Sequence, residues 1–177
     1  MTNTLTAEIP SRTSSPALDF EALYRAARDD VYAYVATLLR DRAAAEDVTA
    51  ATFERAYRKQ RSYKAARGSE RAWLFGIARN AALDELRRRK RAAALAAEPA
   101  DVEATAPDDA AEAALRRAAV RAALAELGAR ERELIALKFH AGLDNSEIAA
   151  VLGVSVSNAG TQLHRAMTKL REAVEHA

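Results

Sequence analysis

Apolar residues recur at helical spacing over three stretches in the first half of the chain. From Leu18 onward they return every three or four residues with charged residues between them, which predicts an amphipathic helix of about five turns. Asp41 can cap a second helix, and Ser69 begins a third after the basic loop SYKAARGSE at residues 62–70. The three helices predict a small bundle that ends near Arg91. The apolar stripes are Leu23, Ala27, Val31, Tyr34, Val35 and Leu38 in the first helix, Val48, Ala51, Phe53, Ala56 and Tyr57 in the second, and Trp73, Ile77 and Ala81 in the third.

The second half of the chain contains shorter helices joined by a tight turn. Asp144 and Glu147 have the spacing of a capping box, Gly153 lies where two short helices must turn, and Ser155 can cap the next helix. The small Ala149, four residues before Gly153, lets the two helices cross closely. This spacing is that of a DNA-binding helix-turn-helix, whose second helix enters the major groove. The alternative is an ordinary helical hairpin with a polar exterior.

The second helix of this pair has a polar face suited to DNA. Opposite its buried stripe lie side chains that can hydrogen-bond base edges and phosphates, and Gln, Asn and Arg are suited to bidentate base contacts. These candidate residues are Ser157, Asn158, Thr161, Gln162, His164 and Arg165.

Two stretches lack a helical pattern. Residues 1–17 are rich in Ser, Thr and Pro and predict a disordered tail. The stretch from Glu98 to Glu112 combines acidic residues with two prolines and has no basic residue, which is typical of an extended linker. We therefore expect a tail at 1–17, a helical domain at 18–92, a flexible acidic linker at 93–114 and a second helical domain at 115–177.

Composition supports an all-α protein and excludes several other classes. Hydrophobic residues make up 50% of the 177 residues, with only 6 Gly and 4 Pro, which favours helices over a sandwich or barrel. The absence of cysteine excludes disulfides and thiolate zinc sites. No apolar run approaches the roughly 20 residues that span a bilayer, and no signal pattern opens the chain, so we expect a cytoplasmic protein.

No pattern in the sequence indicates an enzyme. There is no Gly-rich phosphate loop, nucleophile elbow or carboxylate pair, and His140, His164 and His176 are scattered. We therefore expect no catalytic residues, no metal and no cofactor. The net charge of +2 is the sum of opposite local charges, since the basic run from Arg87 to Arg91 is offset by the acidic linker. The run has more basic residues than are needed to compensate the dipole at the end of a helix. We interpret it as a DNA-backbone contact, with a solvated helix end as the alternative.

The order of these features resembles a bacterial sigma factor of the extracytoplasmic-function (ECF) type. AAEDVTAATFERAYR resembles the region-two helix that binds the RNA polymerase clamp, and WLFGIARNAALDELRRRKR resembles the promoter-melting helix. LGARERELIALKFHAGLDNSEIAAVLGVSVSNAGTQLHRAMTKLRE resembles region four almost throughout. The resemblance implies core RNA polymerase (its beta and beta-prime subunits) and promoter DNA as partners. It also implies an anti-sigma factor and promoter-specific transcription initiation as the function. For the acidic linker it implies a path through a basic polymerase channel, with a plain solvated spacer as the alternative.

The resemblance also assigns roles within the first domain. The polymerase contacts would be Asp47, Val48, Phe53, Glu54 and Arg55, although Ala50 and Ala51 stand where the family often has Gln and Glu. Asn80 and Asp84, one turn apart, would read the melted minus-ten strand, and a flipped base could be held there while phosphates meet nearby arginines. The full minus-ten set is Tyr63, Lys64, Arg67, Ser69, Arg79, Asn80, Asp84, Arg87 and Arg88. We interpret Trp73 as a core residue, with support of the strand-reading loop as the alternative.

The helix proposed to read the minus-thirty-five element departs from the family. Typical members have Val, Lys and Arg where this chain has Ala159, Gly160 and Gln162. Fewer cations predict weaker phosphate anchoring and a weaker salt dependence. Two explanations stay open: the minus-thirty-five sequence that this helix reads is unusual, or the domain relies on help from elsewhere. The sequence is also compatible with two other functions: a dimeric helix-turn-helix regulator that binds duplex DNA without polymerase, and a helical adaptor that binds only proteins.

Overall fold

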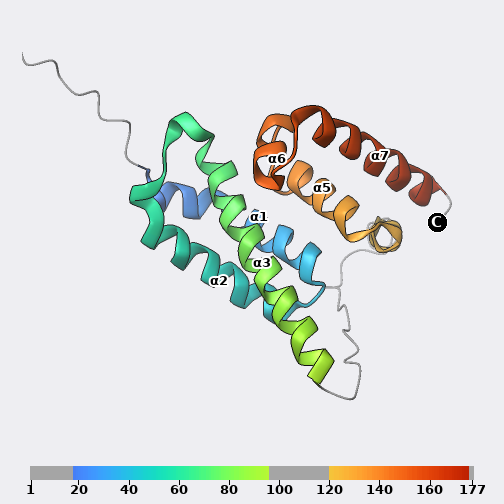
Figure 1. Ribbon diagram of the computed structural model, residues 1–177, viewed down its shortest axis with the longest axis horizontal. Coiled ribbons are helices and arrows are strands. Elements are labelled where there is room, and N and C mark those ends of the chain that lie inside the picture. The colour runs from blue at the N-terminus through green and yellow to red at the C-terminus, as the bar shows by residue number, and fades with distance from the viewer. Residues whose placement is uncertain (1–17, 96–119, 176–177) are drawn as a thin grey trace, which may run out of the picture.

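The computed structural model describes residues 18–95 and 120–175, and all regular secondary structure within them is helical. The first helical unit consists of α1 (Phe20–Leu39), α2 (Arg42–Lys59), the 3-10 turns η1 (Gln60–Ser62) and η2 (Ala65–Arg67), and α3 (Glu70–Leu95). The second helical unit consists of helical residues 120–126, α5 (Ala129–Phe139), α6 (Asn145–Leu152) and α7 (Val156–Glu175). Figure 1 shows the two units side by side. The predicted all-α fold with two helical parts is confirmed, whereas the predicted tail and most of the predicted linker lie outside the described residues.

Helices α2 and α3 of the first helical unit begin at the predicted capping residues. The carboxylate of Asp41 accepts a hydrogen bond from the amide of Ala44 at 3.1 Å, and the hydroxyl of Ser69 accepts one from the amide of Ala72 at 3.1 Å. Helix α3 continues to Leu95, past the predicted end near Arg91. Alanines follow that arginine and no helix breaker occurs before Pro99, so nothing local ends the helix sooner.

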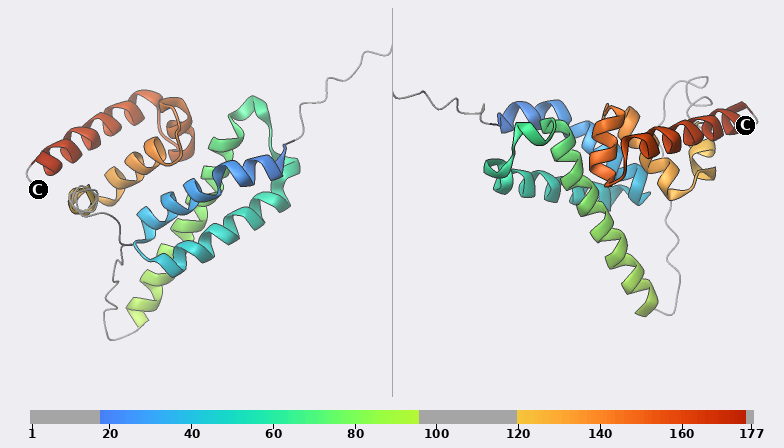
Figure 2. Two further views of the ribbon diagram at one scale, coloured as in Figure 1. Left: turned by 180° about the vertical axis from the view of Figure 1, so that it is seen from behind. Right: turned by 45° about the horizontal axis from the view of Figure 1, so that its top comes forward.

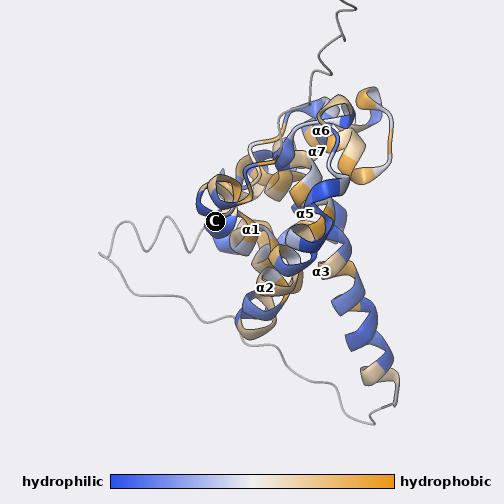
Figure 3. Cartoon of the chain, turned by 90° about the vertical axis from the view of Figure 1, so that its left-hand side faces the viewer, coloured by the Kyte–Doolittle hydropathy of each residue, from blue (hydrophilic) through white to orange (hydrophobic). Residues whose placement is uncertain are grey.

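A buried aromatic pair joins α1 to α3 at the centre of the first helical unit. Tyr34 and Phe75 are both fully buried and meet edge to face with ring centroids 5.4 Å apart. The C-terminal half of α3 extends beyond this core, as Figure 2 shows in its right-hand view, and Figure 3 shows that this extension is hydrophilic. No helix among the described residues is both long and apolar enough to cross a membrane.

The second helical unit contains the predicted helix-turn-helix. Asp144 and Glu147 form the expected capping box at the start of α6. Gly153 ends α6 with a φ of 67°, in the left-handed region that favours glycine, and Ser155 caps the start of α7. Each local signal in the sequence is therefore confirmed in the geometry of the turn.

Two glycines in this unit should respond in opposite ways to alanine. Gly153→Ala places a side chain in a left-handed conformation and is expected to cost about 1–2 kcal/mol of unfolding free energy. Gly160→Ala lies inside α7, where its new Cβ would have only the side-chain amide of Asn145 near it, at 3.4 Å, and it should stabilise by up to about 1 kcal/mol. Urea denaturation of both variants measures the difference, and equal shifts of one sign would refute this reading of the turn.

The two helical units pack against each other. Helix α5 packs on α1, and α6 packs on α3 (Figure 1). Apart from Ala123, the buried apolar side chains of the described residues belong to one cluster that spans both units. The surface between the units is therefore part of the folded core of this structure.

Candidate nucleic-acid interface

A pocket of about 520 Å³ opens beside the basic loop of the first helical unit. The loop, the exposed side of α3 and the edge of α6 surround it. Its lining residues are Ser62, Tyr63, Lys64, Arg67, Gly68, Ser69, Ala72, Trp73, Gly76, Ile77, Asn80, Ala150 and Val151. The structure therefore brings together Tyr63, Lys64, Arg67, Ser69 and Asn80, five of the residues predicted to contact the minus-ten strand.

Two aromatic side chains and a glycine shape the loop at this pocket. The hydroxyl of Tyr63 donates a hydrogen bond to the carbonyl oxygen of Gly68 at 3.1 Å, and Gly68 has a φ of 139°, which few other residues adopt. The rings of Tyr63 and Trp73 lie 5.7 Å apart between centroids. Trp73 is partly buried and packs against the core, as its helical stripe predicted. Its ring also contacts Tyr63 of the loop, so the alternative interpretation holds beside the first.

The predicted minus-ten residues on α3 differ in accessibility. Asn80 and Asp84 are exposed one turn apart, as their spacing predicted. Arg87 donates a hydrogen bond to Asp84 at 3.0 Å and remains exposed, and Arg88 is also exposed. Arg79 instead turns toward the second helical unit and is 20% exposed, so in this arrangement it does not face a strand in the pocket.

Several arginines of the basic run contact acidic residues on their own helical unit. Arg88 and Arg89 both donate to the carboxylate of Glu85, and Arg89 also donates to Asp41 at 2.7 Å, which links α3 to the start of α2. The hydrogen bond from Arg88, together with that from Arg89, lowers the pKa of Glu85 to about 2. Part of the run therefore stabilises the fold, in addition to any contact with DNA.

Glu85→Gln should reduce stability in a pH-dependent way. The pKa of Glu85 falls from 4.5 in a free side chain to about 2 in the fold, so its contribution is complete above pH 4.5 and is lost as the pH falls toward 2. Because Arg88 is 69% exposed, we expect a loss of only about 1 kcal/mol at pH 7. Urea denaturation from pH 7 to pH 3 should show the gap between the two proteins closing.

The control is Glu21→Gln, which removes an ion pair with Arg25 that is exposed on α1. It should change stability by no more than about 0.5 kcal/mol. If the difference in unfolding free energy between the unmodified protein and Glu85→Gln grew as the pH fell, the low pKa of Glu85 would be contradicted.

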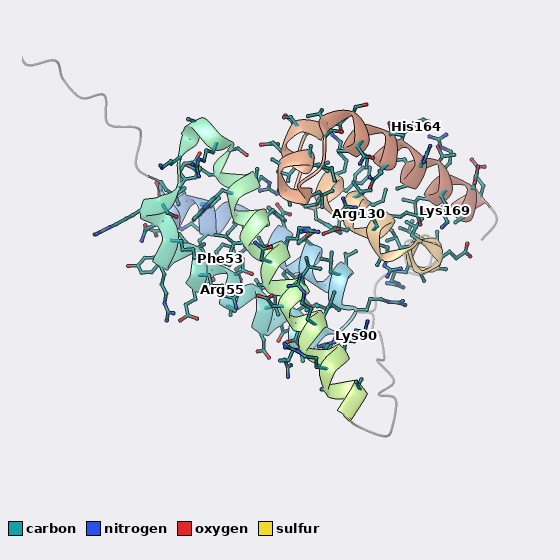
Figure 4. All side chains as sticks on the ribbon, in the orientation of Figure 1. Phe53, Arg55, Lys90, Arg130, His164 and Lys169 are labelled. Carbon is teal, nitrogen blue, oxygen red and sulfur yellow. The ribbon has the colours of Figure 1, made fainter. Side chains whose placement is uncertain are left out.

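The predicted polymerase contacts on α2 divide into exposed and buried residues. Asp47, Glu54 and Arg55 are exposed, while Val48 and Phe53 are 8% and 5% exposed. The ring of Phe53 packs against the ring of Tyr24, with the two centroids 4.8 Å apart, instead of facing solvent. Figure 4 shows Phe53 and Arg55 on the part of the molecule away from the second helical unit. Val48 and Phe53 therefore pack α2 against the core of the first helical unit. Only Asp47, Glu54 and Arg55 are accessible to a partner in this structure.

The predicted recognition face lies along α7. Ser157, Asn158, Thr161, His164 and Arg165 are exposed, and Gln162 is half-buried. Figure 4 shows His164 on the side of α7 away from the first helical unit. The face is thus open to a partner at most of its predicted positions.

Gln162 is the exception, because its side chain is hydrogen-bonded to Arg130, a residue that the sequence analysis did not single out. Its side-chain amide donates to Asn158 at 2.8 Å, and its oxygen accepts a hydrogen bond from Arg130 on α5 at 3.2 Å. Arg130 also donates to Glu133 at 2.9 Å. No local signal in the sequence indicates these contacts, since Arg130 and Gln162 lie 32 positions apart.

Family comparison covers both halves of the chain. Residues 23–92 match the family described as Sigma-70 region 2, and residues 117–170 match the family described as Sigma-70, region 4. The chain is 33% identical over 167 residues to an ECF RNA polymerase sigma factor, SigL, of Mycobacterium tuberculosis, covering 91% of this chain and 94% of the relative. It is 35% identical over 156 residues to the RNA polymerase sigma factor CarQ of Myxococcus xanthus, covering 86% of this chain and 87% of the relative.

Solved structures resemble this chain across both helical units. The sigma factor RpoE, in complex with the anti-sigma factor NepR from Bartonella quintana, matches with a TM-score of 0.68 and 25% identity, over 89% of this chain and 97% of the other. CnrH, in complex with the cytosolic domain of CnrY, matches with a TM-score of 0.62 and 26% identity, over 89% of this chain and 88% of the other.

Proposed function

This chain belongs to the extracytoplasmic-function sigma factors of bacterial RNA polymerase, and from that membership we propose how its two helical units divide the work. Sigma factors are transcription initiation factors that bind core polymerase and direct it to promoters. The division of labour rests above all on one observation, which is the pocket that joins Asn80, the Tyr63 loop and Trp73.

The first helical unit captures the opened minus-ten strand in this pocket. A base that leaves the stack needs an aromatic or apolar surface and a hydrogen-bonding group for its edge, and Trp73 with Asn80 offers both. Exposed Lys64 and Arg67 are at the same opening, where cations favour phosphates. Energy from binding the unstacked base offsets a stacking cost of a few kcal/mol, so the strand opens without any covalent step.

The polymerase binds the exposed face of α2. Asp47, Glu54 and Arg55 provide acidic and basic groups on that face. The buried Val48 and Phe53 keep α2 in place through the core and through the ring contact with Tyr24. Charge complementarity to both types of group on a rigid helix would fix the orientation of the partner and its specificity more than its raw affinity.

The second helical unit reads the minus-thirty-five element with α7. Exposed Asn158 and Arg165 are suited to base edges, and Ser157, Thr161 and His164 to edges or phosphates. Gly160 and Gln162 supply no cation, so this unit alone binds DNA weakly and depends on polymerase to bring it to the promoter.

Regulation and location follow from the same membership. The two similar structures are complexes, one with an anti-sigma factor, and an anti-sigma factor is the partner we propose for this chain. The protein acts without an active site of its own and works in the cytoplasm, where core polymerase transcribes the chromosome.

Run-off transcription with purified core polymerase tests the proposal. Templates drawn from the source genome should give discrete, promoter-specific transcripts only when both the core enzyme and this chain are present. The competing function, a dimeric regulator of duplex DNA, predicts no such transcripts and predicts instead that the chain alone retards palindromic duplexes. That second result would overturn the proposed function.

A further inference from the structure

We propose that Arg130 sets the base preference of α7, by turning the side-chain amide of Asn158 so that it presents hydrogen-bond donors to guanine in the minus-thirty-five element. Asparagine in the major groove ordinarily reads adenine, through one donor and one acceptor. Here the acceptor of Asn158 is engaged within the protein. The inference rests on the proposed function, since it names the base that α7 reads in the element assigned to it.

Three side chains of the second helical unit, Arg130, Gln162 and Asn158, form a hydrogen-bonded series that we call the amide network. The Nε of Arg130 on α5 donates to Oε1 of Gln162 at 3.2 Å, and the Nε2 of Gln162 donates to Oδ1 of Asn158 at 2.8 Å. Gln162 is half-buried, whereas Asn158, one turn nearer the start of α7, is exposed. The amide network therefore leads from α5 to the exposed face of α7.

The guanidinium group at the start of the amide network determines the direction of each hydrogen bond in it. Arginine has five N–H donors and no acceptor, so the atom of Gln162 that faces Arg130 must be its oxygen. The nitrogen of Gln162 then faces Asn158, and only the oxygen of Asn158 can accept its hydrogen bond. The planar amide of Asn158 therefore directs its nitrogen, Nδ2, away from Gln162, with hydrogens to donate.

A buried carboxylate holds Arg130 in place. The Nη1 of Arg130 donates to Oε2 of Glu133 at 2.9 Å, three residues further along α5, and the side chain of Glu133 is only 8% exposed. Hydrogen bonds between charged groups are stronger than those between neutral groups. These partners of Arg130 all belong to the second helical unit, so the amide network requires no contact with the first helical unit.

The base that matches this orientation of Asn158 is guanine. Asn158 lies in the first turn of α7, where a helix-turn-helix places its base contacts. Guanine alone presents two acceptors, N7 and O6, on its major-groove edge, whereas adenine presents one acceptor and one donor. An amide that offers Nδ2 to the groove fits the guanine edge and leaves the amino group of adenine without an acceptor.

Selection of upstream DNA by the holoenzyme tests the inference. Core polymerase with this chain is mixed with promoter fragments whose minus-thirty-five element is randomised, and the bound fragments are sequenced. Asn158→Ala identifies the position that Asn158 reads, as the one whose base preference it abolishes. The unmodified chain should favour guanine over adenine there by at least about fivefold. A preference for adenine, or no position affected by Asn158→Ala, would overturn the inference.

A modified base locates the contact at the level of atoms. Replacing that guanine with 7-deazaguanine removes the N7 acceptor. Binding by the unmodified chain should then fall by about two- to tenfold, while binding by Asn158→Ala should not change. Equal losses in the two proteins would show that Asn158 does not donate to this base and would overturn the inference.

Arg130→Met should relax the preference for guanine. It removes the donor that orients Gln162 and keeps a long unbranched side chain, so both amides can turn over together. Guanine and adenine should then be bound within about twofold of each other. Arg130→Lys retains a cation that can only donate, and it should restore the preference. A merely structural role of Arg130 would weaken binding to every sequence equally, and an unchanged ratio between the two bases would overturn the inference.

Arg132→Met is the matched control for Arg130→Met. It removes the same charged group from the same helix, but Arg132 donates to the carbonyl oxygen of Leu127 and takes no part in the amide network. It should leave the ratio between guanine and adenine unchanged. Thermal melts confirm that each variant is folded. A loss of preference as large as that in Arg130→Met would contradict the role of Arg130.

Gln162→Glu should reverse the preference. A carboxylate cannot donate, so it accepts from Nδ2 of Asn158 as well as from Arg130, which turns the oxygen of Asn158 toward the DNA. The base preferred on the guanine strand should change to one with an amino donor, cytosine or adenine. Arg171→Gln makes the same change in net charge on α7, outside the predicted recognition face, and should keep guanine. Retention of guanine by Gln162→Glu would overturn the inference.

The inference and the proposed function fail in different ways. Run-off transcription by the unmodified chain with core polymerase depends on the proposed function and not on the base that Asn158 reads. A chain that directs transcription but prefers adenine at this position would refute the inference alone. A chain that never directs transcription, and yet by itself binds duplex DNA with a preference for guanine that Asn158→Ala abolishes, would refute the proposed function and support the amide network.

Discussion

Asn80→Ala is expected to reduce open-complex formation by about 10- to 100-fold while leaving the affinity for core polymerase unchanged. Asn80 is exposed on α3 and lines the pocket beside Trp73. Its side-chain amide offers one donor and one acceptor to the edge of a flipped base, and such a bidentate contact is worth about 1–3 kcal/mol. Binding of a labelled core enzyme and permanganate reactivity of the minus-ten thymines separate the two effects.

Arg165→Ala provides the comparison for this prediction. It removes a cation from the exposed face of α7, in the other helical unit. It should weaken binding to upstream duplex DNA and leave strand opening intact once the polymerase is held at the promoter. Equal loss of core binding in both variants would contradict the division of labour between the two units.

Phe75→Ala is expected to cost about 3–5 kcal/mol of unfolding free energy. Phe75 is fully buried, meets Tyr34 edge to face at 5.4 Å, and has the guanidinium carbon of Arg71 5.4 Å from its ring centroid. Truncation leaves a cavity between α1 and α3 and removes both ring contacts. Urea denaturation followed by far-ultraviolet circular dichroism measures the loss.

Leu86→Ala on the same helix is the control for Phe75→Ala. Leu86 is 37% exposed, so its truncation leaves little cavity and should cost roughly 1 kcal/mol or less. If Phe75→Ala cost no more than Leu86→Ala, the aromatic pair would not be the centre of the first unit's core.

The parts of the fold that depend only on residues close together in the sequence were predictable from it. The caps at Asp41 and Ser69, the capping box at Asp144, and the turn at Gly153 all act within four residues, and the structure confirms each of them. The amphipathic spacing likewise located the helices, although it left the end of α3 four residues short.

The candidate site was predictable only where a motif carried it. The resemblance to sigma factors selected Val48 and Phe53 by position in a motif, but burial is decided by packing between helices, and both side chains face the core. The contact of Arg79 with Glu133 joins positions 54 apart, and no periodicity or capping rule indicates it. Trp73 shows the same limit, since its helical stripe predicted a core residue while its ring also supports the loop beside Tyr63.

The most direct test of the account is strand opening at the minus-ten element by the reconstituted holoenzyme. A promoter fragment carrying 2-aminopurine in that element is mixed with the chain, with core polymerase, and with both. We predict a rise in fluorescence only with both, and a rise at least about tenfold slower or smaller with Asn80→Ala. If the complete mixture gave no rise on any promoter while the chain alone bound palindromic duplex DNA, the account would be contradicted.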